Sequence, residues 1–238
     1  MAASVLRLHF QDCFVQGCDG SILLDDVDGT FTGEKTADMN INSVRGFEVI
    51  YQIKANVEAL CPGVVSCADI LALAARDFTV AGGRLSPARL SREANTDLPS
   101  PSTSNLNELI AAFTKKGPPP PREMVALSGA HTIDPTYGET LQSRCSRTSG
   151  DDNLTPLDVT SPDSFDGSYF RDLFRQKGLF HSDQALFDRG STSVFVSVYA
   201  SSEVLFRSDF ANAMVKMSEL NPLTGSDGQV RTNCRPFL

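Results

Sequence analysis

The 238-residue chain has no tryptophan and only three histidines, His9, His131 and His181. Because these histidines are scattered along the sequence, a metal site built from three clustered histidines is nearly excluded. No apolar run approaches the roughly 20 residues that a membrane-spanning helix requires. Lys and Arg number 21 against 29 Asp and Glu, which gives a formal net charge of −8. Such a protein repels phosphate backbones and anionic lipids, so we expect neither nucleic acid nor a membrane as its partner.

The cysteines point to a disulfide framework without proving one. None of them forms a Cys-x-x-Cys pair, which argues against a zinc ribbon or a thioredoxin-like site. An even number fits disulfides, but the count alone leaves free buried thiols as an equal alternative. The start of the chain lacks the continuous apolar stretch of a secretory signal peptide, because Arg7 interrupts it. The six residues are Cys13, Cys18, Cys61, Cys67, Cys145 and Cys234.

Helical spacing of apolar residues predominates, and strand patterns are few and short. We therefore predict a mainly α-helical protein. Ser104 is predicted as the N-cap of one helix, and the four prolines at 118–121 as a stiff connector. Polar, aperiodic segments at 82–101 and 134–156 are predicted to be irregular. The predicted helices cover residues 43–61, 64–76, 104–116, 122–131, 166–177 and 202–220.

Two segments carry a pattern suited to calcium. Residues 12–21 place oxygen donors at nearly alternate positions around Gly17, which permits a tight turn. Calcium prefers six to eight oxygens from carboxylates, carbonyls and hydroxyls. The segment is not an EF-hand, because the glutamate at position twelve is absent, and a plain acidic turn is the alternative. Residues 158–166 repeat the pattern, with a helix N-cap at Ser164 or Asp166 as the alternative.

Two further patterns concern His131 and the segment 7–11. His131 ends an apolar helix, where a lone histidine is usually a core residue; as a metal ligand it needs an acceptor that orients its ring. Arg7 and Gln11 are four residues apart and share one face of a helix. His9 lies roughly 200° around that helix from Arg7.

Together these segments resemble a known family. Residues 6–24 (LRLHFQDCFVQGCDGSILL) closely resemble the distal-helix signature of the secreted class III haem peroxidases of plants, and residues 124–133 (MVALSGAHTI) resemble the proximal signature. The resemblance runs nearly end to end and in the right order. Further matches are NSVRGF at 42–47, VSCAD at 65–69, SDQ at 182–184, SDFA at 208–211 and NPLTG at 221–225.

The resemblance implies a mainly α haem-peroxidase fold, with residues 1–238 as a single domain. Haem b would lie between a distal helix and a proximal helix, with a distal half at about 1–117 and a proximal half at about 122–238. The implied enzyme is a donor:hydrogen-peroxide oxidoreductase that oxidises small phenolic donors. It is expected to be a monomer in the extracellular space or the vacuole.

The resemblance also implies roles for individual residues. His131 would be the axial iron ligand, and Asp183 would accept its other ring proton. Arg7 would stabilise charge on the breaking peroxide bond. Asn40 would be the hydrogen-bond partner of the distal base, and Pro99 would line the exposed haem edge where aromatic donors bind.

Two calcium ions and two disulfides follow from the same resemblance. Cys61 and Cys145 lack their usual partners and are expected to be free thiols. The implied disulfides are Cys13–Cys18 and Cys67–Cys234. The distal calcium ligands would be Asp12, Val15, Gly17, Asp19 and Ser21, with Glu34 linked through water. The proximal ligands would be Thr132, Asp158, Ser161, Ser164 and Asp166.

The sequence departs from the family at its distal base, where Gln11 replaces a histidine. A glutamine can accept a hydrogen bond, but it cannot take a proton from hydrogen peroxide and return it. The sequence also lacks counterparts of the family's first helix and of parts of two internal segments, after Gly83 and after His131. It therefore resembles a truncated or divergent member.

Three functional interpretations follow from these departures. The first is a peroxidase that works but is impaired by Gln11. The second is a non-catalytic haem-binding protein in which His131 ligates iron and the distal side is inert. The third is a structural domain, stabilised by calcium and disulfides, that holds no haem.

Overall fold

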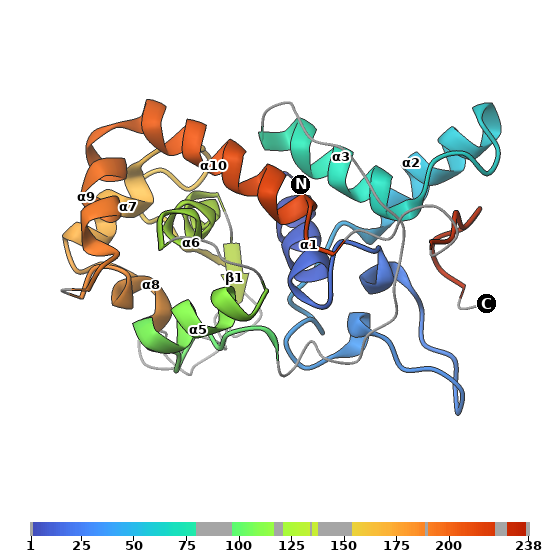
Figure 1. Cartoon of the computed structure of the whole chain (residues 1–238), viewed down its shortest axis with the longest axis horizontal. Coiled ribbons are helices and arrows are strands. Elements are labelled where there is room, and N and C mark those ends of the chain that lie inside the picture. The colour runs from blue at the N-terminus through green and yellow to red at the C-terminus, as the bar shows by residue number, and fades with distance from the viewer. Residues whose placement is uncertain are drawn as a thin grey trace. The chain divides into compact units, whose positions relative to one another are not determined.

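The computed structural model of the chain describes residues 2–79, 97–116, 121–133, 135–137, 154–188, 190–221 and 228–236. The chain forms two compact units. The first consists of Met1–Leu98 together with Met214–Leu238, and the second of Pro99–Ala213. Helices predominate in both units (Figure 1), which confirms the predicted mainly α class. Within the described ranges, no helix is long and apolar enough to cross a membrane.

The first unit is built around α1, which packs against α3, while α2 also packs against α3 (Figure 1). Val5 and Leu8 of α1, Ile50 of α2 and Leu71 of α3 are completely buried. Two 3-10 turns, η1 and η2, follow α1 and pack together. The bounds are α1 Ala2–Phe14, η1 Ser21–Leu23, η2 Glu34–Thr36, α2 Phe47–Leu60 and α3 Cys67–Thr79.

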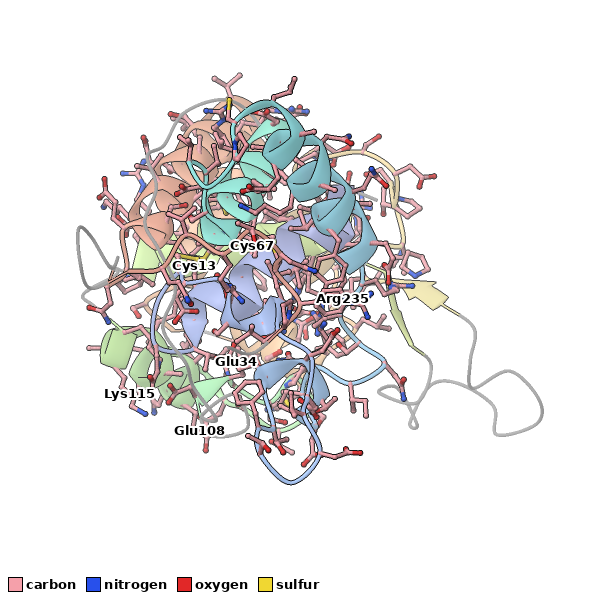
Figure 2. All side chains as sticks on the ribbon, turned by 90° about the vertical axis from the view of Figure 1, so that its right-hand side faces the viewer. Cys13, Glu34, Cys67, Glu108, Lys115 and Arg235 are labelled. Carbon is pink, nitrogen blue, oxygen red and sulfur yellow. A yellow bond between two sulfur atoms is a disulfide. The ribbon has the colours of Figure 1, made fainter. Side chains whose placement is uncertain are left out.

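Both disulfides that the family resemblance implies are present in the first unit. Cys13 and Cys18 close the turn after α1, and Cys67 ties the start of α3 to Cys234 near the C-terminus (Figure 2). Cys61 is an exposed free thiol, as expected. The expected free thiol at residue 145 lies outside the described residues.

Loss of the Cys67–Cys234 disulfide is expected to destabilise the protein strongly. It joins residues 167 positions apart, and a cross-link that closes so long a loop removes much entropy from the unfolded chain. Replacing both cysteines with serine should lower the free energy of unfolding by roughly 2–5 kcal/mol. Urea denaturation would measure this, with Cys61→Ser as a control that changes stability little. Equal stabilities of the two variants would contradict the expectation.

The second unit contains five helices among its described residues, and α7 packs against α9 and against the 3-10 turn η3. A pair of three-residue antiparallel strands, β1 and β2, places Pro135 opposite Pro156. The long helix α10 belongs to both units, since the division falls between Ala213 and Met214. The bounds are α5 Leu106–Lys116, α6 Pro121–Ser128, η3 Gly129–Thr132, β1 Pro135–Tyr137, β2 Leu154–Pro156, α7 Ser168–Phe174, α8 His181–Ala185, α9 Ser193–Ser201 and α10 Glu203–Ser218.

Aromatic side chains form the core of the second unit. Phe170 of α7 lies 5.1 Å from Tyr199 of α9 and 5.0 Å from Phe206 of α10, measured between ring centroids. All three rings are completely buried. Gly129, the first residue of η3, touches this cluster so closely that an added Cβ would lie 2.3 Å from the Phe206 ring. Glycine therefore lets η3, which carries His131, pack directly on the aromatic core.

All six predicted helices exist, with bounds that differ by a few residues. One predicted cap is wrong: Asn105, not Ser104, caps α5, because its side-chain oxygen accepts hydrogen bonds from the backbone N–H groups of Asn107 and Glu108 at 3.0 and 3.2 Å. Ser104 is buried instead. On the exposed side of α5, Glu108 and Lys115 point outward (Figure 2). The predicted irregular segments lie mostly outside the described residues, but the described parts of 134–156 form the strands β1 and β2, so the prediction is wrong there.

Candidate active site

His131 and Asp183 meet in the second unit, although 52 residues separate them. His131 Nδ1 lies 2.8 Å from Asp183 Oδ1. An ionised carboxylate only accepts hydrogen bonds, so Nδ1 carries the proton. The rings of Tyr169 and Phe180 flank the imidazole, with centroids at 5.8 and 6.0 Å. The imidazole is therefore fixed in tautomer and orientation, with 24% of its side chain exposed while the carboxylate is buried.

The Asp183 carboxylate is held by three donors. Besides His131, the hydroxyl of Tyr169 donates to Oδ1 at 2.9 Å, and the backbone N–H of Phe180 donates to Oδ2 at 3.2 Å. Burial, together with the Asp183 charge, raises the pKa of Tyr169 well above its ordinary value, so its hydroxyl stays protonated. No sequence pattern singles out Tyr169, because a tyrosine on the apolar face of a helix is typical of a core residue.

The first unit carries the residue expected to act on peroxide, Arg7, the residue in place of the distal base, Gln11, and the expected partner of that base, Asn40. Arg7 on α1 donates from Nη2 to Ser43 Oγ at 2.7 Å. Gln11, one turn later, is buried, and its Oε1 has no hydrogen-bond partner. The side-chain N–H of Asn40 donates to the backbone oxygen of Glu34 at 2.8 Å, whereas its Oδ1 is also buried without a partner. The side-chain oxygens of Gln11 and Asn40 are thus both buried acceptors without a donor.

Four residues of the expected distal calcium site, including the water-linked Glu34, lie together at the end of α1 and in the turns that follow it. Asp12, Asp19, Ser21 and Glu34 are all buried. Ser21 Oγ donates to Glu34 Oε1 at 2.9 Å, and Asp12 Oδ1 has no partner. Burial raises the pKa of Asp12 well above its usual range, and the nearby Asp19 carboxylate raises it further, although backbone N–H groups and Arg231 oppose this. Val15 and Gly17 lie in the connecting turn, where Gly17 adopts φ +122. The donor set is hard and oxygen-rich, which fits calcium.

The expected proximal calcium ligands lie together in the second unit. Thr132 Oγ1 donates to Asp158 Oδ2 at 2.8 Å and contacts the backbone oxygen of Ser164 at 3.2 Å. Ser161 Oγ donates to Asp166 Oδ2 at 3.0 Å. Thr132 neighbours His131 in the chain, so this oxygen cluster adjoins the imidazole. Asp166 also accepts a hydrogen bond from the backbone N–H of Ser168, the first residue of α7. It therefore also acts as a cap at the start of this helix, which is the alternative interpretation of the segment.

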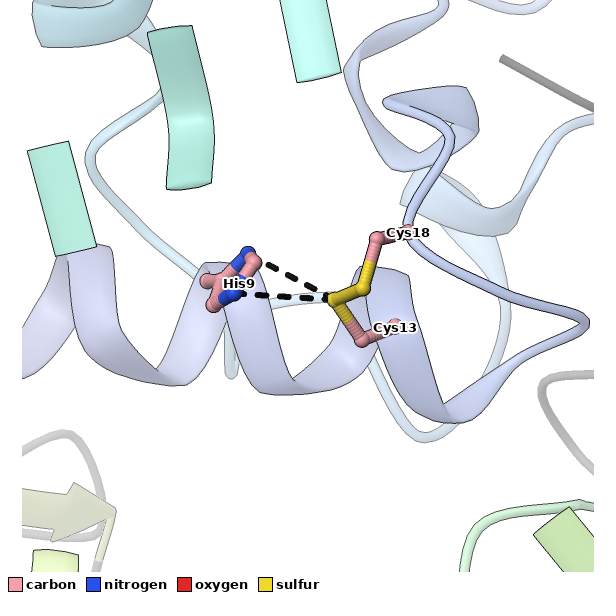
Figure 3. Close-up of side chains that lie close together, drawn as sticks. All are labelled: His9, Cys13 and Cys18. Atoms are coloured by element: carbon pink, nitrogen blue, oxygen red, sulfur yellow. Dashed lines mark hydrogen bonds between the residues drawn. A yellow bond between two sulfur atoms is a disulfide. The ribbon is translucent and has the colours of Figure 1, made fainter. Parts of the chain in front are cut away.

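His9 lies on α1 beside the Cys13–Cys18 disulfide (Figure 3). The three side chains bring potential metal-ligand atoms within 4.8 Å of one another, but the two sulfurs are bonded to each other and are not thiolates, so this is no metal site. Both ring nitrogens lie 3.5–3.6 Å from Cys13 Sγ. Ser218 donates its own proton to Met214 O, so it accepts from His9 Nε2 at 3.1 Å.

The burial of His9 predicts a pH-dependent stability. Burial lowers the pKa of His9 from 6.5 to about 4. Between these values the unfolded chain is protonated at His9 and the folded protein is not, so the free energy of unfolding falls as the pH drops. The loss from His9 is roughly 3 kcal/mol over this range. Urea denaturation at pH 7 and pH 4.5 measures how much free energy of unfolding a protein loses between these two pH values. This loss should be about 2–3 kcal/mol smaller in His9→Gln than in the unmodified protein. Equal losses in both proteins would contradict the prediction.

Comparison with known proteins identifies the family to which these clusters belong. A family model described as peroxidase matches residues 1–202. Peroxidase P7 of Brassica rapa subsp. rapa is 50% identical, over 98% of this chain and 88% of that protein. The chain belongs to the class III plant peroxidase family. Peroxidase 70 of Zea mays is 48% identical and the lignin-forming anionic peroxidase of Nicotiana sylvestris 46%, each over 98% of this chain and 81% of the relative.

The family makes this protein a haem peroxidase, and the residues present fit haem. His131 offers an imidazole whose Nδ1–H is held by a buried carboxylate, the arrangement that suits a histidine ligand of iron. The unpartnered oxygens of Gln11 and Asn40 are polar atoms that a bound group or water can satisfy. The alignment with Peroxidase P7 extends over 264 positions, more than the 238 residues of this peroxidase, so that relative contains residues with no counterpart here.

Proposed function

We propose that this peroxidase binds haem b through His131 and uses hydrogen peroxide to oxidise small phenolic donors, slowly, because Gln11 stands where the family has its distal base. The observation that carries the proposal is the 2.8 Å contact between His131 Nδ1 and the buried Asp183 carboxylate. A carboxylate in this position makes the imidazole a stronger electron donor to a metal bound at Nε2.

Haem, when bound, supplies the redox centre that hydrogen peroxide oxidises and that aromatic donors then reduce. The protein's residues hold and orient the reactants. The Arg7 guanidinium, held by Ser43, would stabilise the negative charge that develops as the peroxide O–O bond breaks. Pro99 would contact the aromatic donor, as in the family.

Gln11 is the reason that we expect the reaction with peroxide to be slow. Proton transfer from the first peroxide oxygen to the leaving oxygen needs a group that takes up and releases a proton. The carboxamide of Gln11 accepts a hydrogen bond through Oε1, but it has no pKa in the accessible range. Water must then carry the proton, and the reaction loses the contribution of general acid–base catalysis.

Calcium binding at the distal and proximal oxygen clusters is part of the proposal. Asp12 and Asp19 are buried near each other, and a divalent cation would offset their repulsion. One peptide bond and one hydrogen bond link the distal calcium cluster to Gln11 and Asn40. Asp12 directly follows Gln11, and Asn40 is bonded to the backbone of Glu34. The distal ion would therefore brace the segment that carries Gln11.

Asp19→Ala is expected to lower the melting temperature and to disturb the haem spectrum together, because it removes a buried ligand of the distal ion. A chelator added to the calcium-loaded protein should do the same, and its effect should be smaller in the variant. Asp28→Ala, which removes an exposed carboxylate from a nearby loop, is the matched control. The calcium proposal fails if a chelator leaves both the melting temperature and the spectrum unchanged in protein shown to start with bound calcium.

The remaining elements of the proposal concern the setting of the enzyme. The extracellular space or the vacuole suits the two disulfides, which persist in oxidising compartments. The family resemblance further implies a monomer. Sedimentation of the haem-loaded protein and localisation of a tagged chain would test these points. A stable oligomer or a cytosolic chain with reduced Cys67 and Cys234 would contradict them.

Two spectroscopic experiments separate the three functional interpretations. A Soret band with histidine ligation after haem reconstitution would exclude the haem-free structural domain. Stopped-flow mixing with hydrogen peroxide then separates a slow peroxidase from an inert haem binder. We expect a measurable but slow reaction, followed by oxidation of a phenolic donor such as guaiacol. If no reaction with peroxide is seen, the protein is an inert haem binder. This is the second candidate function because residue 11 is a glutamine, which cannot take up a proton.

A further inference from the structure

Tyr169 is a buried polar residue that the chemistry described above does not use. Its hydroxyl donates to Asp183 Oδ1 at 2.9 Å, and this is the same oxygen that accepts from His131 Nδ1 at 2.8 Å. The other carboxylate oxygen, Oδ2, is occupied by the backbone N–H of Phe180. One carboxylate oxygen therefore serves two side-chain donors, one of which is the expected axial ligand.

We propose that Tyr169 is a positioning residue that limits the electron-donating strength of His131 by sharing Asp183 Oδ1 with it. The proposal rests on the ligation of iron by His131 set out above. Tyr169 extends the pair formed by His131 and Asp183 to a triad. In this triad the tyrosine hydroxyl competes with the imidazole N–H for the negative charge of a single carboxylate oxygen.

The direction of the effect follows from hydrogen-bond competition. A carboxylate oxygen that accepts a hydrogen bond has less charge to offer to a second donor. With Tyr169 bound, the proton of His131 Nδ1 stays closer to the imidazole. Without the hydroxyl, Asp183 pulls that proton more strongly, and the imidazole gains imidazolate character. A more basic imidazole binds iron more tightly and stabilises the oxidised state.

The surroundings of Tyr169 keep its hydroxyl in this role. The residue is 1% exposed, so water does not compete for the hydroxyl. Its ring packs edge-on against His131 at 5.8 Å and against Phe170 at 5.1 Å. Phenylalanine preserves both ring contacts and removes the oxygen alone, which makes Tyr169→Phe a clean substitution.

The test uses two properties of the haem-loaded protein that do not depend on turnover. These are the iron–histidine stretching band in the resonance Raman spectrum of the ferrous form, and the Fe(III)/Fe(II) midpoint potential. Tyr169→Phe should move the band to higher frequency and the potential to more negative values. In an Asp183→Asn background the same substitution should cause a much smaller shift, because the amide oxygen still accepts hydrogen bonds but the carboxylate charge for which the two donors compete is gone.

Tyr199→Phe is the matched control. Tyr199 is also completely buried in the second unit, but its hydroxyl donates to Asp209 Oδ2 at 2.8 Å. Its loss should lower the melting temperature without moving the band or the potential. If Tyr169→Phe does not fold, incorporation of fluorotyrosine gives a second test. The more acidic fluorophenol is a stronger donor to Asp183, so the iron–histidine band should shift to lower frequency. The shift should be the same in Tyr199→Phe, which shows that it does not come from Tyr199.

The inference is overturned if Tyr169→Phe lowers the melting temperature yet leaves both the band and the potential unchanged, since Tyr169 would then be purely structural. It is overturned equally if fluorotyrosine moves neither the band nor the potential. A wild-type protein without any iron–histidine band would overturn the proposed ligation by His131 as well, so the two failures are distinguishable.

Discussion

Replacing Gln11 with histidine is expected to accelerate the reaction of the haem-loaded protein with hydrogen peroxide by about 10²–10⁴. This corresponds to roughly 3–5 kcal/mol of activation free energy. The imidazole supplies the proton acceptor that the carboxamide lacks. The family resemblance gives Asn40 as the hydrogen-bond partner of the distal base, and its Oδ1, buried without a partner, would accept from the N–H of the new imidazole. Stopped-flow absorbance at the Soret band measures the rate constant.

Two control variants separate base catalysis from a simple change of shape. Gln11→Leu fills similar space without a polar group, and it should react as slowly as the unmodified protein. Asn40→Leu combined with Gln11→His removes the acceptor for the new imidazole and should cancel most of the gain. If Gln11→His leaves the peroxide rate flat while haem stays bound, the missing base does not limit the reaction. A distorted pocket would then be the cause.

His131→Ala is expected to abolish specific haem ligation, which is the second large effect. The substitution removes the imidazole and leaves the buried Asp183 carboxylate with one donor fewer on Oδ1. Absorbance titration with haem should show loss of the histidine-ligated Soret spectrum, and the ferrous carbon monoxide complex should change accordingly. Stability should also fall, since a buried carboxylate loses a hydrogen bond to a partner that fixed it.

His181→Ala provides the comparison for this loss. His181 is another histidine of the second unit, and it lies exposed at the start of α8. Its removal should leave haem binding and the Soret spectrum as they are. Retention of a normal histidine-ligated spectrum in His131→Ala would show that another residue ligates the iron.

Much of the helical architecture follows from sequence periodicity, and the exceptions have physical reasons. α8 has five residues, too few for an apolar period to emerge. α9 reads SVFVSVYAS, and its valines favour extended structure on their own. It is helical because Val196 and Tyr199 are buried in the second unit, and Tyr199 packs against Phe170. Tertiary packing therefore overrides local propensity in this segment.

The candidate site is less predictable from the residues alone. Nothing in the spacing pairs His131 with Asp183; the pairing is expected from the family resemblance, and the 2.8 Å contact agrees with it. The acidic segments do suggest oxygen clusters, because their ligands lie close in sequence. Tyr169 and Ser43 escape prediction, since their bonds to Asp183 and Arg7 depend on how distant elements pack.

The most direct test of the central claim, that this haem peroxidase keeps its axial ligand but lacks its distal base, is the rate constant for its reaction with hydrogen peroxide after haem reconstitution. Stopped-flow measurement should give a histidine-ligated Soret band and a rate constant at least about 10² below that of Gln11→His. A rate constant for the unmodified protein near the diffusional ceiling of about 10⁸–10⁹ M⁻¹s⁻¹ would contradict the claim.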